Sequence, residues 1–307
     1  MNNLTSRVVI KVLRALQETC SHLGFGRKRR IPTDPGTGAF TCITKDLCKI
    51  TGWYFREPER SDGTVIWLHG FGGSCVGNDL PKTLYDIRKE FKVCTVAFDF
   101  RCHGCSDDRI PSLGLAESWD TMAVLSYLEE NHFPRPFVLV GESMGGMIAG
   151  HVARCDSRVE AAICLMPPSC PLYAMLGLPK ILQRLLRRAV KRSYQADLLL
   201  DSDLTFHNCN PEHKPLLFYI MGENDPYDWR KTKIIWDHWY KETPSQFDVG
   251  PEKAPNQRKW FQVIPDKGHD LSKILFPYLV DYFTHAGLSA DPTETRHSEY
   301  PLLPRMV

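Results

Sequence analysis

The sequence has no apolar run long enough to cross a membrane, which takes about 20 consecutive apolar residues. We also expect no secretory signal, because Arg7, Lys11 and Arg14 interrupt every apolar stretch near the start of the sequence. Neither sign of charge is in large excess, since 38 Lys and Arg residues stand against 36 Asp and Glu and give a net charge of +2. This balance gives no indication of a nucleic-acid partner.

Nucleotide-binding motifs are absent as well. Neither Gly-x-x-x-x-Gly-Lys-Ser/Thr nor a helix-opening Gly-x-Gly-x-x-Gly occurs, so we expect no nucleotide cofactor, and we predict no other cofactor and no metal. The 11 cysteines are odd in number and scattered, which is typical of reduced intracellular thiols rather than of a disulfide framework. We therefore expect a cytoplasmic protein.

What is present is the composition of a globular protein, with 43% apolar and 24% charged residues in 307 positions. Three parts are expected: an N-terminal helix and basic linker (1–38), a main domain (39–289) and a weakly ordered tail (290–307). Within the main domain, an insertion at 168–214 interrupts the regular pattern and is predicted to form a small helical lid. The sequence does not specify an oligomeric state.

Strands and helices alternate through most of the main domain. Phe40–Ile43 and Ile50–Phe55 predict an opening antiparallel hairpin. The buried strands that follow are expected at 64–68, 93–98, 137–140, 159–165, 216–221 and 260–264. The helices are expected at 80–90, 118–130, 231–241 and 271–285, besides one that starts within 143–146. Such alternation predicts an α/β fold with a mostly parallel sheet and helices on both faces.

One stretch organises the rest, from Phe137 to Gly150. It reads as a buried strand, a tight turn at Gly141-Glu142-Ser143-Met144-Gly145 and a helix. This Gly-x-Ser-x-Gly turn is a nucleophile elbow when a strand precedes it and a helix follows. We therefore predict that Ser143 is a nucleophile.

Two further residues follow buried strands in the order that such a nucleophile requires. Asp225 comes after the strand at 216–221, and His269 comes after the last strand. A serine hydroxyl needs an imidazole to take its proton, and the imidazole needs a carboxylate to orient it. We assign His269 as base and then acid, and Asp225 as the orienting group, in preference to Glu223 and Asp228.

The negative charge of a tetrahedral intermediate needs two N–H donors. We assign the backbone N–H of Met144, which follows the nucleophile, and that of Phe71 in the turn His69-Gly70-Phe71-Gly72-Gly73. His69 is interpreted as part of this turn and His103 as a structural residue of the next loop.

Together these motifs resemble the α/β-hydrolase superfamily over roughly Phe40 to His285. The matching segments are His69-Gly70-Phe71-Gly72, residues 99–106 (the loop often written Asp-x-Arg-Gly-His-Gly-x-Ser), Gly141–Gly146, Gly222–Asp225 and Gly268-His269. Glu142 and Met144 are most similar to the branch of monoglyceride lipases and serine aminopeptidases. The chain departs from the usual loop at Cys102, where the family has glycine.

The cysteines near the site have two interpretations each. Cys102-His103-Gly104-Cys105 contains a Cys-x-x-Cys pair that could serve metal or redox chemistry, but a single pair within a structural loop favours a structural role. Cys75 is either a reactive thiol or a small filler of the core.

Two segments are amphipathic and basic. Leu4–Cys20 has an apolar face and is followed by Arg27-Lys28-Arg29-Arg30, and Lys180–Arg192 within the insertion has apolar and basic faces. The first is either a helix packed on the core followed by a solvated loop or an interfacial helix that contacts anionic membrane through Leu4–Arg30. The second is either a lid helix with a solvated face or a binder of substrate carboxylate, phosphate or membrane.

The resemblance implies a serine hydrolase that cleaves carboxylic esters through an acyl-enzyme, with a small-molecule acyl ester as substrate. The apolar lid suggests lipid esters or thioesters. The alternatives are an aminopeptidase or amidase of the same fold, or a non-catalytic binding protein.

Overall fold

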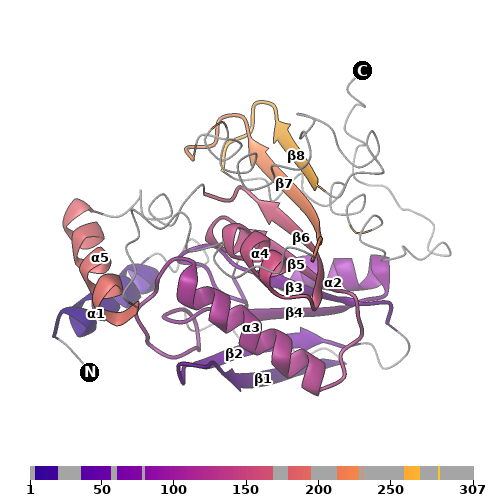
Figure 1. Ribbon diagram of the computed structural model, residues 1–307, viewed down its shortest axis with the longest axis horizontal. Helices are drawn as coiled ribbons and strands as arrows, with labels where there is room; N and C mark the ends of the chain where they lie inside the picture. The colour runs from indigo at the N-terminus through magenta and orange to yellow at the C-terminus, as the bar shows by residue number, and fades with distance from the viewer. Residues whose placement is uncertain are drawn as a thin grey trace.

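In the computed structural model, an eight-stranded sheet carries helices on both faces (Figure 1). The residues described are 4–19, 36–56, 61–77, 80–168, 179–194, 213–227, 230, 259–269 and 283. Among them, no helix combines the length and the hydropathy of a membrane span.

The strands lie in the order β1-β2-β4-β3-β5-β6-β7-β8. Their bounds are β1 Thr37–Ile43, β2 Lys49–Phe55, β3 Thr64–Leu68, β4 Cys94–Asp99, β5 Phe137–Glu142, β6 Val159–Leu165, β7 Leu216–Gly222 and β8 Lys259–Ile264. β2 pairs antiparallel with β1 and with β4, and every other pair is parallel. The predicted fold class and the antiparallel opening hairpin are therefore confirmed.

The helices divide between the two faces of the sheet. Their bounds are α1 Leu4–Thr19, α2 Leu80–Phe91, α3 Leu115–Glu130, α4 Met144–Cys155 and α5 Lys180–Tyr194. One apolar cluster joins α1, α3, α4 and α5 to one face, and a second joins α2 and Phe283 to the other. Side chains of β3 alternate between them, with Ile66 and Leu68 in the first cluster and Val65 and Trp67 in the second.

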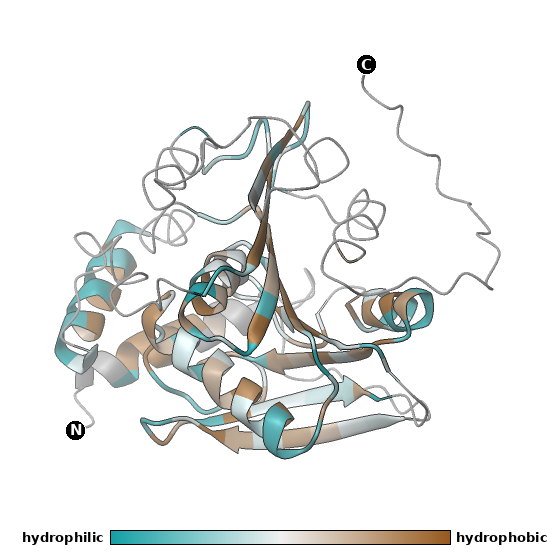
Figure 2. Ribbon diagram, turned by 45° about the vertical axis from the view of Figure 1, so that its right-hand side comes forward, coloured by the Kyte–Doolittle hydropathy of each residue, from teal (hydrophilic) through white to brown (hydrophobic). Residues whose placement is uncertain are grey.

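Burial on both faces explains why the central strands are continuously apolar. Every residue of β3 and of β4 is buried, as expected for strands covered by helices on each side. Figure 2 shows the same contrast, with hydrophobic colour along the inner strands and hydrophilic colour on the outer sides of the helices.

The element predictions match closely where the structure describes them. α3 begins at Leu115 rather than Ser118, because the Glu117 carboxylate turns back and accepts the N–H of Gly114 at 2.8 Å. The basic helix predicted over Lys180–Arg192 is confirmed as α5. Two predicted helices, at 231–241 and 271–285, lie outside the described residues apart from Phe283. The tail predicted at 290–307 also lies outside them.

The parallel strands place their carboxyl ends along one edge of the sheet. β5 leads directly into Ser143, and the turns after β7 and β8 hold Asp225 and His269. Open α/β sheets bind ligands at this edge. The three residues predicted from the sequence are thus carried there by strands β5, β7 and β8.

Candidate active site

Ser143 occupies a strained turn between β5 and α4. Its backbone has φ 54° and ψ −119°, a conformation that few residues other than glycine adopt. The Ser143 N–H donates to the carbonyl oxygen of Leu165 in β6 at 2.8 Å, which ties the turn to the neighbouring strand. This sharp turn places the Ser143 side chain at the point where β5 ends and α4 begins.

The glycines on either side make this turn possible. A Cβ atom on Gly145 would lie 2.1 Å from the carbonyl oxygen of Leu68, and one on Gly141 would lie 2.1 Å from the carbonyl oxygen of Gly145. Both distances are far below van der Waals contact. The Gly-x-Ser-x-Gly spacing is therefore required by the close approach of α4 to β3 and β5.

Asp225 and His269 form a hydrogen-bonded pair. The Nδ1 atom of His269 lies 2.8 Å from Oδ2 of Asp225, whose side chain is fully buried while the imidazole is 34% exposed. The other carboxylate oxygen accepts the N–H of Tyr227 at 2.8 Å. Both oxygens of Asp225 are engaged, so the carboxylate and the imidazole it contacts are held in one orientation.

The rival carboxylate Glu223 is placed differently. Its Oε2 accepts the N–H of Asp266 at 3.1 Å, near the surface. Asp228 lies outside the described residues. Of the two described acids in this turn, the one bonded to His269 is Asp225.

Tyr227 connects the nucleophile candidate to the imidazole. Its phenol is hydrogen-bonded to the Ser143 side chain, and its ring meets the imidazole of His269 edge-on at 4.6 Å between centroids. Burial raises the pKa of Tyr227, although the bond with Ser143 opposes that shift, so the phenol is protonated near neutral pH. The structure thus brings Ser143, Asp225 and His269 around one tyrosine. Sequence reasoning missed this residue, for which the only signal was a hydroxyl two positions after Asp225.

The turn at His69–Gly73 lies directly beside Ser143. A Cβ atom on Gly70 would lie 3.3 Å from Cβ of Ser143. In this turn the N–H of Gly72 donates to Nε2 of His103 at 3.1 Å, and that of Gly73 donates to the carbonyl oxygen of Gly70 at 3.0 Å.

His69 and His103 hold the loops that flank the site. Nε2 of His69 accepts the N–H of Phe100 at 3.1 Å, so Nδ1 carries the proton and donates to the Gly70 carbonyl oxygen at 2.7 Å. Nδ1 of His103 likewise donates to the Arg101 carbonyl oxygen at 2.8 Å. Burial lowers the pKa of His69, which keeps its ring neutral. The structural interpretation of both histidines is confirmed.

Asp99, at the end of β4, joins two of these loops. Its two carboxylate oxygens accept the N–H groups of Cys75 and Cys105, each at 2.8 Å. Cys102, the departure from the family loop, has φ 60°. This left-handed conformation is the one that glycine adopts without strain, which accounts for the usual residue at that position.

The thiols near the site do not form a metal or redox centre among the described residues. Cys75 and Cys105 are free thiols, and no cluster of potential metal ligands occurs in the part of the chain that is described. Cys75 is buried, and burial raises its pKa well above the ordinary value, so it is a filler rather than a reactive thiol. Cys155, at the end of α4, is disulfide-bonded, so the expectation of reduced cysteines is wrong at this residue.

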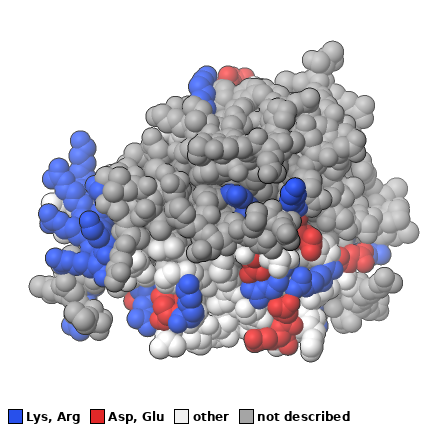
Figure 3. Space-filling model, viewed as in Figure 1, with Lys and Arg blue, Asp and Glu red and all other residues white. Residues whose placement is uncertain are grey.

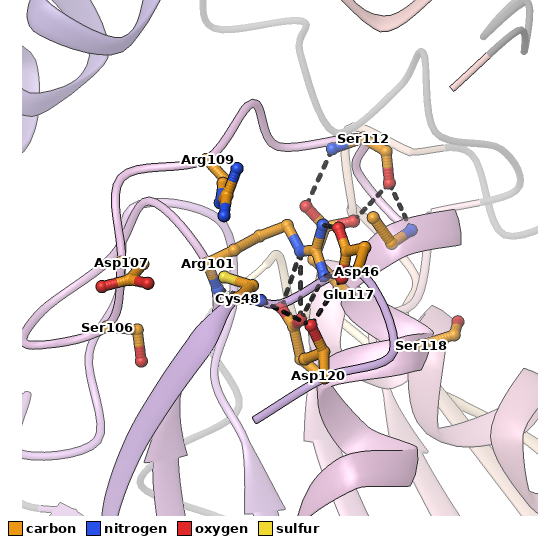
Figure 4. A network of polar contacts seen from close by, with 12 residues as sticks. Asp46, Cys48, Arg101, Ser106, Asp107, Arg109, Ser112, Glu117, Ser118 and Asp120 are labelled. Carbon is orange, nitrogen blue, oxygen red and sulfur yellow. Dashed lines mark hydrogen bonds and ion pairs between the residues drawn. The ribbon is translucent and has the colours of Figure 1, made fainter. Parts of the chain in front are cut away.

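A buried ion-pair network braces the loop after β4 (Figure 4). The Arg101 guanidinium, with no exposed surface, lies 2.6 Å from Oδ1 of Asp120 in α3 and 2.8 Å from Oδ2 of Asp46. It also donates to the hydroxyl of Tyr194, the last residue of α5, at 3.0 Å. Burial opposes the charge on Arg101, but the neighbouring carboxylates outweigh it and raise its pKa. The network links the opening hairpin, α3 and α5 at one point.

Comparison with known proteins agrees with this fold. Residues 65–302 match the model of the alpha/beta hydrolase family, so the chain belongs to that family. The match covers the elbow and the turns that carry Phe71, Asp225 and His269.

Solved structures show the same fold at low sequence identity. The Pyrococcus furiosus esterase Pf2001 is 20% identical, with 85% of this chain and 97% of that chain covered and a TM-score of 0.58. Brefeldin A esterase, described as a bacterial homologue of human hormone sensitive lipase, is 16% identical over 93% and 86% of the two chains, with a TM-score of 0.59. XC6422 from Xanthomonas campestris, an a/b serine hydrolase without lid, is 18% identical over 86% and 100%, with a TM-score of 0.54.

Proposed function

We propose that this protein is a serine hydrolase that cleaves carboxylic esters through an acyl-enzyme intermediate. The observation that carries the proposal is the convergence on Tyr227, whose phenol contacts Ser143 while its ring contacts the imidazole bonded to Asp225. Membership of the hydrolase family and esterases among the structures of similar fold support the same reaction class.

In the first half-reaction, Ser143 Oγ attacks the ester carbonyl carbon while Nε2 of His269 takes its proton. Asp225 accepts the Nδ1–H of His269, fixes the tautomer that leaves Nε2 free to act as a base, and stabilises the imidazolium that forms. His269 then returns the proton to the leaving alcohol, and the acyl group remains on Ser143. Water repeats the sequence and releases the acid.

The oxyanion would be bound by the amides of Phe71 and Met144. The neighbouring amides are already engaged, which supports this choice of donors. The N–H of Ser143 bonds Leu165, that of Gly72 bonds His103, and that of Gly73 bonds Gly70. No hydrogen-bond partner of the Phe71 amide is found among the described residues. Met144 is the first residue of α4, where an amide points out of the helix and the helix dipole favours negative charge.

The proposal extends to the acyl part of the substrate. We propose an apolar acyl group, as the family match and the similar fold of an esterase described as a homologue of hormone sensitive lipase suggest. The rates at which the protein hydrolyses esters, thioesters and aminoacyl amides will distinguish these three substrate classes.

A fluorophosphonate probe tests the proposal. The wild-type protein should be labelled, Ser143→Ala should not, and Ser193→Ala, which removes an exposed hydroxyl from α5, should be labelled as the wild type is. A p-nitrophenyl ester series from acetate to laurate, run beside acyl thioesters and aminoacyl amides, then defines the substrate. Labelling that persists in Ser143→Ala would contradict the proposed nucleophile, and faster turnover of the amides would make the protein an amidase or aminopeptidase.

A further inference from the structure

Two helices that are far apart in the sequence form one surface. α1 and α5 pack against each other, and Figures 1 and 2 both show them side by side at the edge of the molecule. Val9 and Leu13 of α1 and Leu182 and Leu186 of α5 are buried in the same apolar cluster. The basic helices predicted separately from the sequence therefore lie side by side, and their exposed sides are here called the α1–α5 face.

α5 gives this face its charge. The helix has no acidic residue, and its cations are Lys180, Arg184, Arg187, Arg188, Lys191 and Arg192. Arg184, Arg188 and Lys191 are exposed and, at spacings of four and three residues, they lie on one side of the helix, opposite the buried Leu182 and Leu186. Figure 3 shows Lys and Arg side chains gathered at the edge where Figure 1 places α5, with no acidic side chain among them in this view.

The cations surround a hollow. A cavity of about 310 Å³ is lined, among the described residues, by Arg184, Arg187, Arg188 and Lys191. Guanidinium groups bind phosphate oxygens through paired hydrogen bonds, and several together suit a phosphate-bearing group better than a single carboxylate. The charge and the hydrogen-bond donors of the residues that line the hollow therefore suit a phosphate head group.

Apolar side chains accompany the charge. Five large hydrophobic residues are exposed in the described part of the chain, and Val8, Val12 and Ile181 of this face are three of them, with Ile181 66% exposed. Arg7 and Lys11 are exposed beside them on α1. Cations mixed with exposed aliphatic side chains fit the head-group region of a bilayer, which offers anions and hydrocarbon at adjacent depths. A dissolved polyanion offers no hydrocarbon to these side chains.

We propose that the α1–α5 face binds the surface of a lipid bilayer that carries anionic head groups. The binding is peripheral, with lipid phosphates at the cations of α5 and with Val8, Val12 and Ile181 at the level of the acyl-chain boundary. It does not depend on the proposed ester hydrolysis.

Vesicle co-sedimentation of the full chain tests this. Wild-type protein should sediment with phosphatidylcholine vesicles containing 30% phosphatidylserine and not with pure phosphatidylcholine. The triple variant Arg184→Gln/Arg188→Gln/Lys191→Gln should bind about a hundredfold more weakly, since each cation near an anionic surface contributes roughly fivefold. Its matched control is Lys49→Gln/Lys82→Gln/Lys89→Gln, which removes the same charge from exposed sites elsewhere and should bind as the wild type does.

Further readouts separate this binding from other causes. Circular dichroism melts of both triple variants show whether each is folded. Binding should weaken in 0.5 M salt, because the charges are exposed and screened. Ile181→Ser should weaken it with no change of charge.

Three outcomes would overturn the proposal. These are equal losses in both folded triple variants, equal binding to neutral and anionic vesicles, and binding of inorganic phosphate without any binding to vesicles. The last would make the hollow a site for a small dissolved anion. Since none of these readouts uses catalysis, an inactive but vesicle-bound protein would contradict only the proposed hydrolysis.

Discussion

The ring of Tyr227 stands at 88° to the imidazole of His269, with 4.6 Å between the two centroids. An edge-on contact of this kind restricts rotation of the imidazole, and the phenol of the same residue is bonded to Ser143. Tyr227 therefore contacts both partners of the proton transfer proposed here.

Tyr227→Phe separates these two contacts, because it keeps the ring and removes the hydroxyl. We expect kcat/KM for a p-nitrophenyl ester to fall about three- to tenfold, the usual worth of one neutral hydrogen bond. Tyr227→Ala removes the ring contact as well and should cost more. Steady-state kinetics beside the rate of fluorophosphonate labelling check this. An unchanged rate in both variants would show that Tyr227 only fills space.

Asp225→Asn keeps the shape of the side chain and reverses the proton pattern toward Nδ1 of His269. The amide cannot accept and orient the imidazole as the carboxylate does, so kcat should fall by about three to four orders of magnitude. Glu223→Gln is the control, since Glu223 bonds only the Asp266 amide, and its kcat should stay within about tenfold of wild type. A larger loss in Glu223→Gln than in Asp225→Asn would reassign the acid.

Gly145→Ala should destabilise the fold itself. The added methyl would lie 2.1 Å from the Leu68 carbonyl oxygen, and neither backbone can move without breaking the packing of α4 on β3. We expect a loss of about 3 kcal/mol or more in the free energy of unfolding, measured with urea. Gly268→Ala, whose Cβ would meet nothing closer than 3.8 Å, should change it by less than about 1 kcal/mol. Equal stability of the two variants would mean that the elbow tolerates a wider turn.

His151 makes stability depend on pH. Burial in α4, with a smaller effect from Arg154, lowers its pKa to about 3, whereas an unfolded histidine titrates near 6.5. The folded state therefore disfavours the proton, so this contribution to stability is complete above about pH 6.5 and is lost as the pH falls toward 3. Between pH 8 and pH 5 the loss should be roughly 2 kcal/mol.

Urea unfolding at the two pH values measures that loss. His151→Gln should show a shallower dependence by about the same amount, while His132→Asn, at a residue outside the buried set, should follow the wild type. Identical slopes for His151→Gln and the wild type would place the pH dependence elsewhere.

The strands and the turn at Ser143 could be predicted because nearby residues in the sequence determine them. Buried strands such as β5 are continuous apolar runs because helices cover both sides of the sheet. The turn around Ser143 was predicted from the spacing of its glycines, which the close packing of the turn requires. Asp225 and His269 were found through their order along the chain and the strands before them. The glycine spacing and the apolar strands lie within a few residues of the features that they predict, and only the order of Ser143, Asp225 and His269 extends along the chain.

Contacts between distant segments could not be predicted in this way. Arg101 was visible only as a member of a family loop, and nothing near it in the sequence named Asp46, Asp120 or Tyr194 as its partners. The packing of α1 on α5 likewise depends on the tertiary fold, since an amphipathic pattern identifies a buried face without naming what covers it.

The bond between Tyr194 and Arg101 limits how α5 could be exchanged for another helix. The phenol accepts from the guanidinium and donates to the carbonyl oxygen of Ile110 at 2.5 Å, so the C-terminal end of α5 completes the polar surroundings of a charge inside the parent domain. A helix from another hydrolase placed here instead of α5 would have to bring its own oxygen to that position. The last residue of α5 is therefore fitted to the rest of the fold, and exchanges of this helix should retain Tyr194.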